Sequence, residues 1–191
     1  ELNKRTAEIA ISNGIKVHTG TLDTVILNNK YDCIFLGDII EHVPDPKSFL
    51  IKCRDLLKQD GIIIISTPNL DCFWSKSTFL LYKILKIPWS SLTPPYHLFQ
   101  FSFKNLIEIA EKNDLKYSNS WYTGRPRLMY ELGSLHLVKK IKNSKSIMKI
   151  FYSIYTIISF TLYSVLYFIS SLLNFTKVTK KDFAMVIVFK K

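Results

Sequence analysis

Cysteine is scarce in this chain of 191 residues, and its placement excludes a disulfide framework. The three cysteines are Cys33, Cys53 and Cys72, and no two of them form a C-x-x-C pair. Two of the three fall at predicted core positions, and nothing else in the spacing favours a bridge. A reducing compartment is therefore the simplest interpretation.

Negative charge is in short supply as well, and signals for secretion and for RNA binding are missing. Fifteen acidic residues stand against 26 lysines and arginines, which gives a formal net charge of +11 and a pI near 9.5. Such a balance favours an anionic partner, either nucleic acid or a membrane surface. The chain has no secretory signal at its start and no RNA-binding motif, and its lysines cluster around apolar segments. We therefore expect a membrane surface as partner and no nucleic acid.

Two uninterrupted apolar runs with a helical pattern between them predict a strand-helix-strand unit in the middle of the chain. The runs lie at residues 34–36 and 62–65, and runs without alternation are typical of strands buried on both faces of a parallel sheet. Between them Asp45 can cap and Pro46 can open an amphipathic helix. The fold class is therefore predicted to be α/β.

Cap signals and periodicity predict further elements on either side of this unit. Residues 2–13 indicate a helix capped by Asn3, with Ile9 and Ala10 on its inner side, and residues 15–18 a short strand after it. Later in the chain, Ser102 can cap a helix over residues 103–113, which a strand over residues 115–123 would follow.

Polar residues follow each of the two apolar runs, at the edge where parallel sheets place their ligands. Gly37, Asp38, Glu41 and His42 follow the first run, and STPN follows the second. At these residues the chain resembles the class I S-adenosylmethionine (SAM)-dependent methyltransferases, in the branch of ubiquinone-biosynthesis O-methyltransferases and envelope sugar and lipid methyltransferases. The matching segments are DCIFLGDIIEHVPDP, LLKQDGIIIISTPN and PPYHLFQFS, and the resemblance covers residues 1–124 and 182–191.

The resemblance implies a Rossmann-like sheet in which strands 115–123 and 183–191 pair antiparallel at one edge. The family's first strand and its glycine-rich turn would precede Glu1, so we expect the chain to be a piece of something longer. A sheet without its first strand leaves unpaired backbone groups, which are costly when buried. The expected organisation is a core over residues 1–124 with a lid-like insertion at 70–95, a basic and hydrophobic membrane-associated insertion over 125–181, and the last core strand over 182–191.

The same resemblance implies SAM as the cofactor and assigns residues to it. Glu1 matches the acidic residue whose carboxylate accepts hydrogen bonds from the ribose hydroxyls, although an ordinary exposed glutamate is the alternative. Thr21 and Leu22 stand in the loop that contacts the adenine. Gly37 and Asp38 would line the rest of the cofactor cleft.

His97 and His42 are the candidate general bases on an acceptor hydroxyl. Imidazole titrates near neutral pH, and the family pattern places His97 at the cleft, although a structural role for this histidine is the alternative. Some relatives carry E-x-x-E-H and a later histidine as a metal site. We expect no metal here; a divalent cation on Asp38, Glu41, His42 and His97 is one alternative, and local backbone pairing of Glu41 and His42 is another.

Residues 150–175 form a run of 26 residues without a charge, long enough as a helix to cross the roughly 30 Å core of a bilayer. Neighbouring strands on both sides of the insertion would exclude a single crossing, because the chain must return to the side that it left. The flanking lysines agree with this topology: they are Lys139, Lys140, Lys142, Lys145, Lys149, Lys177, Lys180 and Lys181.

On a helical wheel the serines, threonines and tyrosines of this run gather on one side and the aliphatic residues on the other, with Thr161 as the exception. We expect a helix in the membrane interface or a re-entrant hairpin, with spanning and burial against the protein as alternatives. The aromatic and basic segment 70–95 has the composition of an interfacial helix, or of a lid packed on its own domain.

The predicted function is transfer of a methyl group from SAM to an acceptor at the cytoplasmic face of a membrane. The expected acceptor is the hydroxyl of a lipophilic or lipid-linked small molecule or glycan. The alternative is a non-catalytic, membrane-bound remnant that has kept the sheet but not the cofactor pocket.

Overall fold

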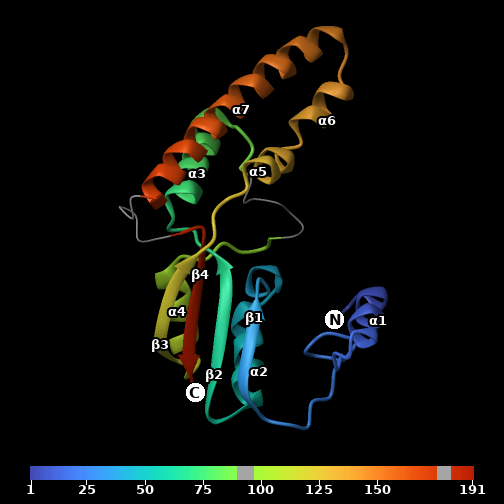
Figure 1. The fold of residues 1–191 in the computed structure, drawn as a ribbon, viewed down its shortest axis with the longest axis vertical. Helices are drawn as coiled ribbons and strands as arrows, with labels where there is room; N and C mark the ends of the chain where they lie inside the picture. The colour runs from blue at the N-terminus through green and yellow to red at the C-terminus, as the bar shows by residue number, and fades with distance from the viewer. Residues whose placement is uncertain (90–96, 176–181) are drawn as a thin grey trace.

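The structure, a computed structural model, describes residues 1–89, 97–175 and 182–191. Its elements in chain order are α1 (Lys4–Ser12), β1 (Tyr31–Gly37), the 3₁₀ helix η1 (Ile40–His42), α2 (Pro46–Leu56), β2 (Leu57–Pro68), α3 (Phe73–Leu85), α4 (Phe103–Glu111), β3 (Lys116–Thr123), α5 (Leu128–Ser134), α6 (Leu137–Lys142), α7 (Ser146–Phe175) and β4 (Ala184–Lys190). Figure 1 shows the sheet with α2 and α4 at one end of the molecule and α3, α5, α6 and α7 at the other.

The four-stranded sheet has the order β1-β2-β4-β3. β1 and β2 are parallel, from the pair Cys33 and Ile62 to the pair Gly37 and Ser66, with α2 between them in the chain. The predicted strand-helix-strand unit is therefore confirmed. β4 runs antiparallel to both β2 and β3, which confirms the expected pairing of the last strand with residues 115–123.

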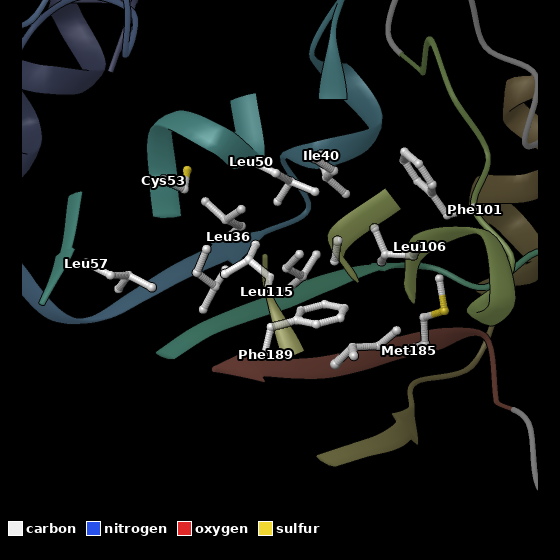
Figure 2. Packing of buried hydrophobic residues seen from close by; sticks show 14 residues of the cluster. Leu36, Ile40, Leu50, Cys53, Leu57, Phe101, Leu106, Leu115, Met185 and Phe189 are labelled. Carbon is white, nitrogen blue, oxygen red and sulfur yellow. The ribbon is translucent and has the colours of Figure 1, made fainter. Parts of the chain in front are cut away.

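Helices α2 and α4 cover one face of the sheet and form its core (Figure 2). The side chains that meet there are at most 2% exposed: Leu50, Cys53, Ile63, Ile65, Leu106, Ala110, Ile187 and Phe189. Burial of one such aliphatic or aromatic side chain contributes about 1.5–3 kcal/mol. Both helices begin where predicted, because the Asp45 and Ser102 side chains accept hydrogen bonds from the N–H groups of Ser48 and Asn105, at 3.1 and 3.2 Å.

The prediction that the apolar runs are buried on both faces is wrong for β1. Leu36 packs into the core, whereas Phe35 on the opposite face is 63% exposed and Cys33 is exposed. A strand side chain is buried only where another element covers its face, and both α2 and α4 lie on the Leu36 side. In the described part of the chain, the apolar run therefore has one covered face.

The predicted short strand over residues 15–18 is not formed, because no strand of the described chain lies beside it to complete a ladder. Two hydrogen bonds join this segment to the start of the chain instead. The α-amino group of Glu1 donates to the carbonyl of His18, and the N–H of Gly20 donates to the carbonyl of Glu1, each at 3.0 Å.

Helix α1 is capped by Asn3 as predicted, through a 3.2 Å hydrogen bond from the N–H of Thr6. The prediction that Ile9 faces inward is wrong, since its side chain is 55% exposed. Ala7 is the buried residue of this helix, and Figure 1 shows α1 set apart from the sheet, so little of the helix is covered.

Helices α3, α5, α6 and α7, here called the helical layer, pack together around a second core. The edge of the Tyr163 ring meets the Trp74 ring, with centroids 5.6 Å apart. The hydroxyls of Tyr155 and Tyr163 donate to the carbonyls of Lys86 and Pro88, at 2.7 and 3.0 Å, which fixes α7 to the end of α3. Several predicted features lie outside the described residues: the SSLTPP end of the lid-like segment, Tyr96 of the third family motif, and the lysines at 177, 180 and 181.

Helix α7 turns its polar side toward the protein. Thr156 and Ser159 are at most 8% exposed, whereas Ile157 and Phe168 are 65% and 71% exposed. The predicted two-sidedness is confirmed, including Thr161 on the outer side, but burial of the apolar side against the described chain is not observed. The stretch Ser146–Leu173 has the length and composition needed to cross a membrane.

Candidate functional site

The strands β1 and β2 end side by side, and the chain turns sharply away from the sheet at Asp38. The N–H of Asp38 donates to the carbonyl of Ser66 at 2.9 Å, and the Ser66 hydroxyl donates to Oδ1 of Asp38 at 3.4 Å. The φ of Asp38 is +50°, a left-handed conformation that costs free energy in a residue other than glycine. This turn leads directly into η1, which carries Glu41 and His42.

Glu41 is a buried carboxylate at the centre of the site. The residue is 1% exposed, and its Oε2 accepts a 2.9 Å hydrogen bond from Oγ1 of Thr67 at the end of β2. Its Oε1 has no hydrogen-bond partner among the described residues and lies 4.0 Å from Nε2 of His42. Burial therefore raises the pKa of Glu41, because a desolvated carboxylate is disfavoured.

The two predicted bases are brought together by the backbone of Glu41. Its carbonyl accepts hydrogen bonds from the N–H groups of Leu98 and Phe99, at 2.9 and 3.1 Å, and so holds the segment after His97 against η1. The rings of His97 and His42 meet edge to face, with centroids 4.8 Å apart. Two imidazoles and one buried carboxylate thus converge.

The donor set of this group fits a divalent cation. Glu41, His42 and His97 each offer one ligand atom, and these atoms lie within 4.8 Å of one another. Imidazole and carboxylate ligands suit several divalent transition metals, and the unpartnered Oε1 of Glu41 supplies a free lone pair. Asp38, the fourth candidate ligand, is outside this group.

A cleft of about 570 Å³ opens beside this group. Leu2, Thr21, Leu22, His42 and the first turns of α2 are among its walls, and an ion pair between Asp23 and Lys52 joins the loop to the helix. The volume is typical of a small-molecule site. The structure therefore brings the predicted residues Thr21, Leu22 and His42 into one cleft, and His42 belongs both to the cleft and to the group with His97.

The other predicted cofactor residues lie elsewhere. Glu1, Gly37 and Asp38 are not among the described residues that line the cleft. The Glu1 carboxylate is exposed and accepts a 2.9 Å hydrogen bond from the N–H of Asn3. Gly37 lies at the end of β1, where an added Cβ would meet the Phe35 ring at 2.8 Å. Their roles in cofactor binding stay predictions.

Asn69, for which no role was predicted from the sequence, lies at a junction of three segments. Asn69 is fully buried; its N–H donates to the carbonyl of Phe183 at 2.8 Å, and its side-chain amide donates to the carbonyl of Asp182 at 3.0 Å. It also forms a β-bridge with Phe101. Thr67 was missed too; the signal for both residues was their place in STPN, directly after a buried strand.

The mixed sheet with β4 antiparallel to its neighbours, and a polar site beyond the ends of two parallel strands, define a Rossmann-like methyltransferase fold. Residues 4–119 match the family model described as a methyltransferase domain, and the chain belongs to this family. The resemblance to class I SAM-dependent methyltransferases is thereby confirmed.

Curated relatives include ubiquinone biosynthesis O-methyltransferases. The protein of Haemophilus ducreyi is 38% identical over 68 residues, which cover 31% of this chain and 29% of the relative. The protein of Bradyrhizobium sp. is 25% identical over 107 residues, covering 51% of this chain and 42% of the relative. The chain thus matches less than half the length of either relative.

Solved structures share the fold at low sequence identity. The YcgJ protein of Bacillus subtilis aligns with a TM-score of 0.54 at 13% identity, over 100% of this chain and 79% of the other. A SAM-dependent methyltransferase of Archaeoglobus fulgidus aligns with a TM-score of 0.50 at 15% identity, over 100% and 74%. These similarities establish the architecture alone.

Proposed function

We propose that this protein transfers a methyl group from SAM to a hydroxyl of a lipophilic or lipid-linked acceptor at the cytoplasmic face of a membrane. The observation that carries the proposal is the position of His42, which lines the cleft and also meets His97. A donor bound in the cleft then lies next to two groups that can take a proton from an acceptor. The curated relatives that match the chain are named for O-methylation, which supports a hydroxyl as the acceptor.

The chemistry asked of the side chains is modest. In an in-line displacement the acceptor oxygen forms a bond to the methyl carbon as the bond from that carbon to the SAM sulfur breaks. The acceptor proton passes to Nε2 or Nδ1 of His97 or His42, and the rest of the rate enhancement comes from alignment. A divalent cation held by Glu41, His42 and His97 would polarise the acceptor hydroxyl.

The outward apolar face of α7 supports the membrane part of the proposal. Aliphatic and aromatic side chains on that face are exposed by half or more: Ile150, Phe151, Ile154, Ile157, Ile158, Val165, Phe168 and Leu172. Contiguous exposed apolar surface of this kind marks a protein or membrane contact. Lysines precede the helix, as is usual at a cytoplasmic membrane face.

The test is binding and turnover measured on the same variants. Isothermal titration should show SAM binding, and methyl transfer to a prenylated phenol in vesicles should be detectable by mass spectrometry. His97→Gln should lower kcat by about 10²–10⁴-fold with unchanged SAM affinity, because His97 is a candidate base that does not line the cleft. His42→Gln should lower both kcat and the affinity for SAM, because His42 lines the cleft and meets His97.

His18→Gln is the matched control, because His18 is exposed and lies outside the cleft walls. Turnover that survives in both His97→Gln and His42→Gln would reject the base assignment. Absence of SAM binding by the unaltered protein would support the alternative, a non-catalytic remnant bound to the membrane.

A further inference from the structure

A second pocket, of about 470 Å³, lies between α6 and α7, outside the cleft described above. Its six lining residues are His136, Lys139, Lys140, Asn143, Ser144 and Tyr152. Each of these side chains carries a donor group, although the Ser144 hydroxyl already donates to the carbonyl of Lys140 at 2.6 Å, and none carries a negative charge. The composition matches an anion such as a phosphate, for which lysine is a frequent partner.

The carboxylate that precedes this basic pocket in the chain is that of Glu131 on α5, which is 5% exposed and accepts a 3.4 Å hydrogen bond from Nε1 of Trp74. In the described chain, residues 132–175 contain five lysines and no acidic residue, and residues 72–89 contain three lysines and no acidic residue. Most of the protein's net charge of +11 therefore belongs to the helical layer and its connections. A field of one sign concentrates anions at the pocket.

Apolar side chains lie next to the basic pocket along α7. Ile147, Ile150 and Phe151 are 83%, 66% and 60% exposed, and they begin the outward apolar face that continues through Ile157 to Phe168. An inorganic anion would leave this face in water. An occupant with an anionic head and hydrocarbon tails would satisfy both features at once.

We propose that the basic pocket binds the phosphate of an anionic glycerophospholipid, whose acyl chains lie along the outward face of α7. The proposal rests on the membrane association proposed above and adds its lipid specificity. It also places α7 in the plane of one leaflet. Because α6 packs beside α7, a spanning α7 would carry Lys139 and Lys140 toward the hydrocarbon, where charged side chains are disfavoured.

The experiment is vesicle flotation of the intact protein, with phosphatidylcholine alone and with phosphatidylcholine containing phosphatidylglycerol. The unaltered protein should bind the anionic vesicles more tightly. The double substitution Lys139→Gln with Lys140→Gln should weaken that binding about thirtyfold, since each lysine near an anionic surface contributes about 1 kcal/mol. Binding to phosphatidylcholine should stay unchanged.

The matched control removes the same charge from the sheet. Lys104 on α4 and Lys116 on β3 are exposed, and substitution of both by glutamine should leave vesicle binding within about twofold. An equal loss in this control would overturn the pocket in favour of general electrostatic attraction. Equal binding of the unaltered protein to both kinds of vesicle would also overturn it.

Two further measurements distinguish a lipid phosphate from a soluble phosphate, and the lipid pocket from the membrane association proposed above. Inorganic phosphate should not displace the protein from anionic vesicles beyond the effect of chloride at equal ionic strength; displacement would identify a soluble phosphate as the ligand. Phe168→Ser with Ile157→Ser should weaken binding to both vesicle types. If the protein binds neither type of vesicle, the proposed membrane association is contradicted. If only the preference for anionic lipid is missing, the lipid-binding role of the pocket alone is contradicted.

Discussion

At the scale of single residues, Glu41 links folding to the chemistry of the site. Its carboxylate is buried with one hydrogen bond from Thr67, while its backbone carbonyl holds the segment that carries His97. A buried charge with few partners destabilises the fold and is retained where it serves a function. We interpret Glu41 as a positioning residue that holds the segment after His97 against η1.

The raised pKa of Glu41 has a testable consequence for stability. A folded-state pKa above the ordinary value of 4.5 means that the folded protein binds this proton more tightly than the unfolded chain does. The resulting stability is present below about pH 4.5 and is lost as the pH rises through the folded pKa. Glu41→Gln should therefore melt at a higher temperature than the unaltered protein at pH 7.5, and the difference should vanish or reverse at pH 4.

Glu108 provides the control with the opposite sign. The hydrogen bond and charge of Lys112 lower the pKa of Glu108. Its contribution to the stability of the folded protein is therefore present above the ordinary pKa and is lost in acid. Glu108→Gln should give no stabilisation at pH 7.5. A gain for Glu41→Gln that is equal at pH 4 and pH 7.5 would show that charge is not the cause.

Much of the site could be predicted from the sequence, and the misses share a physical cause. Asp45, Ser102 and the two apolar runs act locally, so cap and periodicity rules locate their elements. Burial of Phe35 and pairing of residues 15–18 depend on neighbours distant in the chain, which periodicity cannot supply. Thr67 and Asn69 were missed for the same reason, because their partners lie on η1 and before β4.

At the scale of elements, α7 shows what a helical wheel does and does not determine. The wheel separates its serines and threonines from its isoleucines, and the structure keeps that separation. The wheel does not say which side meets the protein. Here the small polar side packs on the helical layer, since serine and threonine hydroxyls can bond to carbonyls of the preceding turn, as Ser159 does to Tyr155 at 2.7 Å.

This orientation predicts unequal effects of two substitutions two residues apart. Ser159→Leu adds volume at a fully buried position between Tyr155 and Tyr163, so it should lower the free energy of unfolding by about 1–3 kcal/mol. Ile157→Leu on the outer face should change it by less than about 0.5 kcal/mol. Urea unfolding followed by circular dichroism would measure both. A larger loss at Ile157 than at Ser159 would mean that α7 faces the other way.

At the scale of the whole molecule, the sheet and the helical layer present different surfaces to their surroundings. Cys33 is exposed on the sheet, whereas Cys53 and Cys72 are buried. Burial raises the pKa of Cys53 to about 12 and that of Cys72 above its ordinary value, so neither forms the reactive thiolate at neutral pH.

Thiol labelling then reports which end of the molecule meets a membrane. One thiol, that of Cys33, should react in the native protein, and anionic vesicles should leave its rate unchanged. Met148→Cys, at an exposed position on α7, should add a second reactive thiol that the vesicles slow severalfold. Equal protection of both thiols would indicate clustering of the protein, and protection of Cys33 alone would reverse the orientation.

The hydrogen bonds of Asn69 hold together the segments that connect the sheet with the helical layer. A single amide side chain ties the exit of β2 to Asp182, 113 positions away, while its neighbour Leu70 donates to the carbonyl of Phe101. Three of the segments that connect the sheet with the helices therefore meet at Asn69. This junction is two residues from Thr67, the hydrogen-bond partner of Glu41. If the membrane association proposed above holds, a force on the helices would reach the sheet through this junction, beside the hydrogen bond between Thr67 and Glu41.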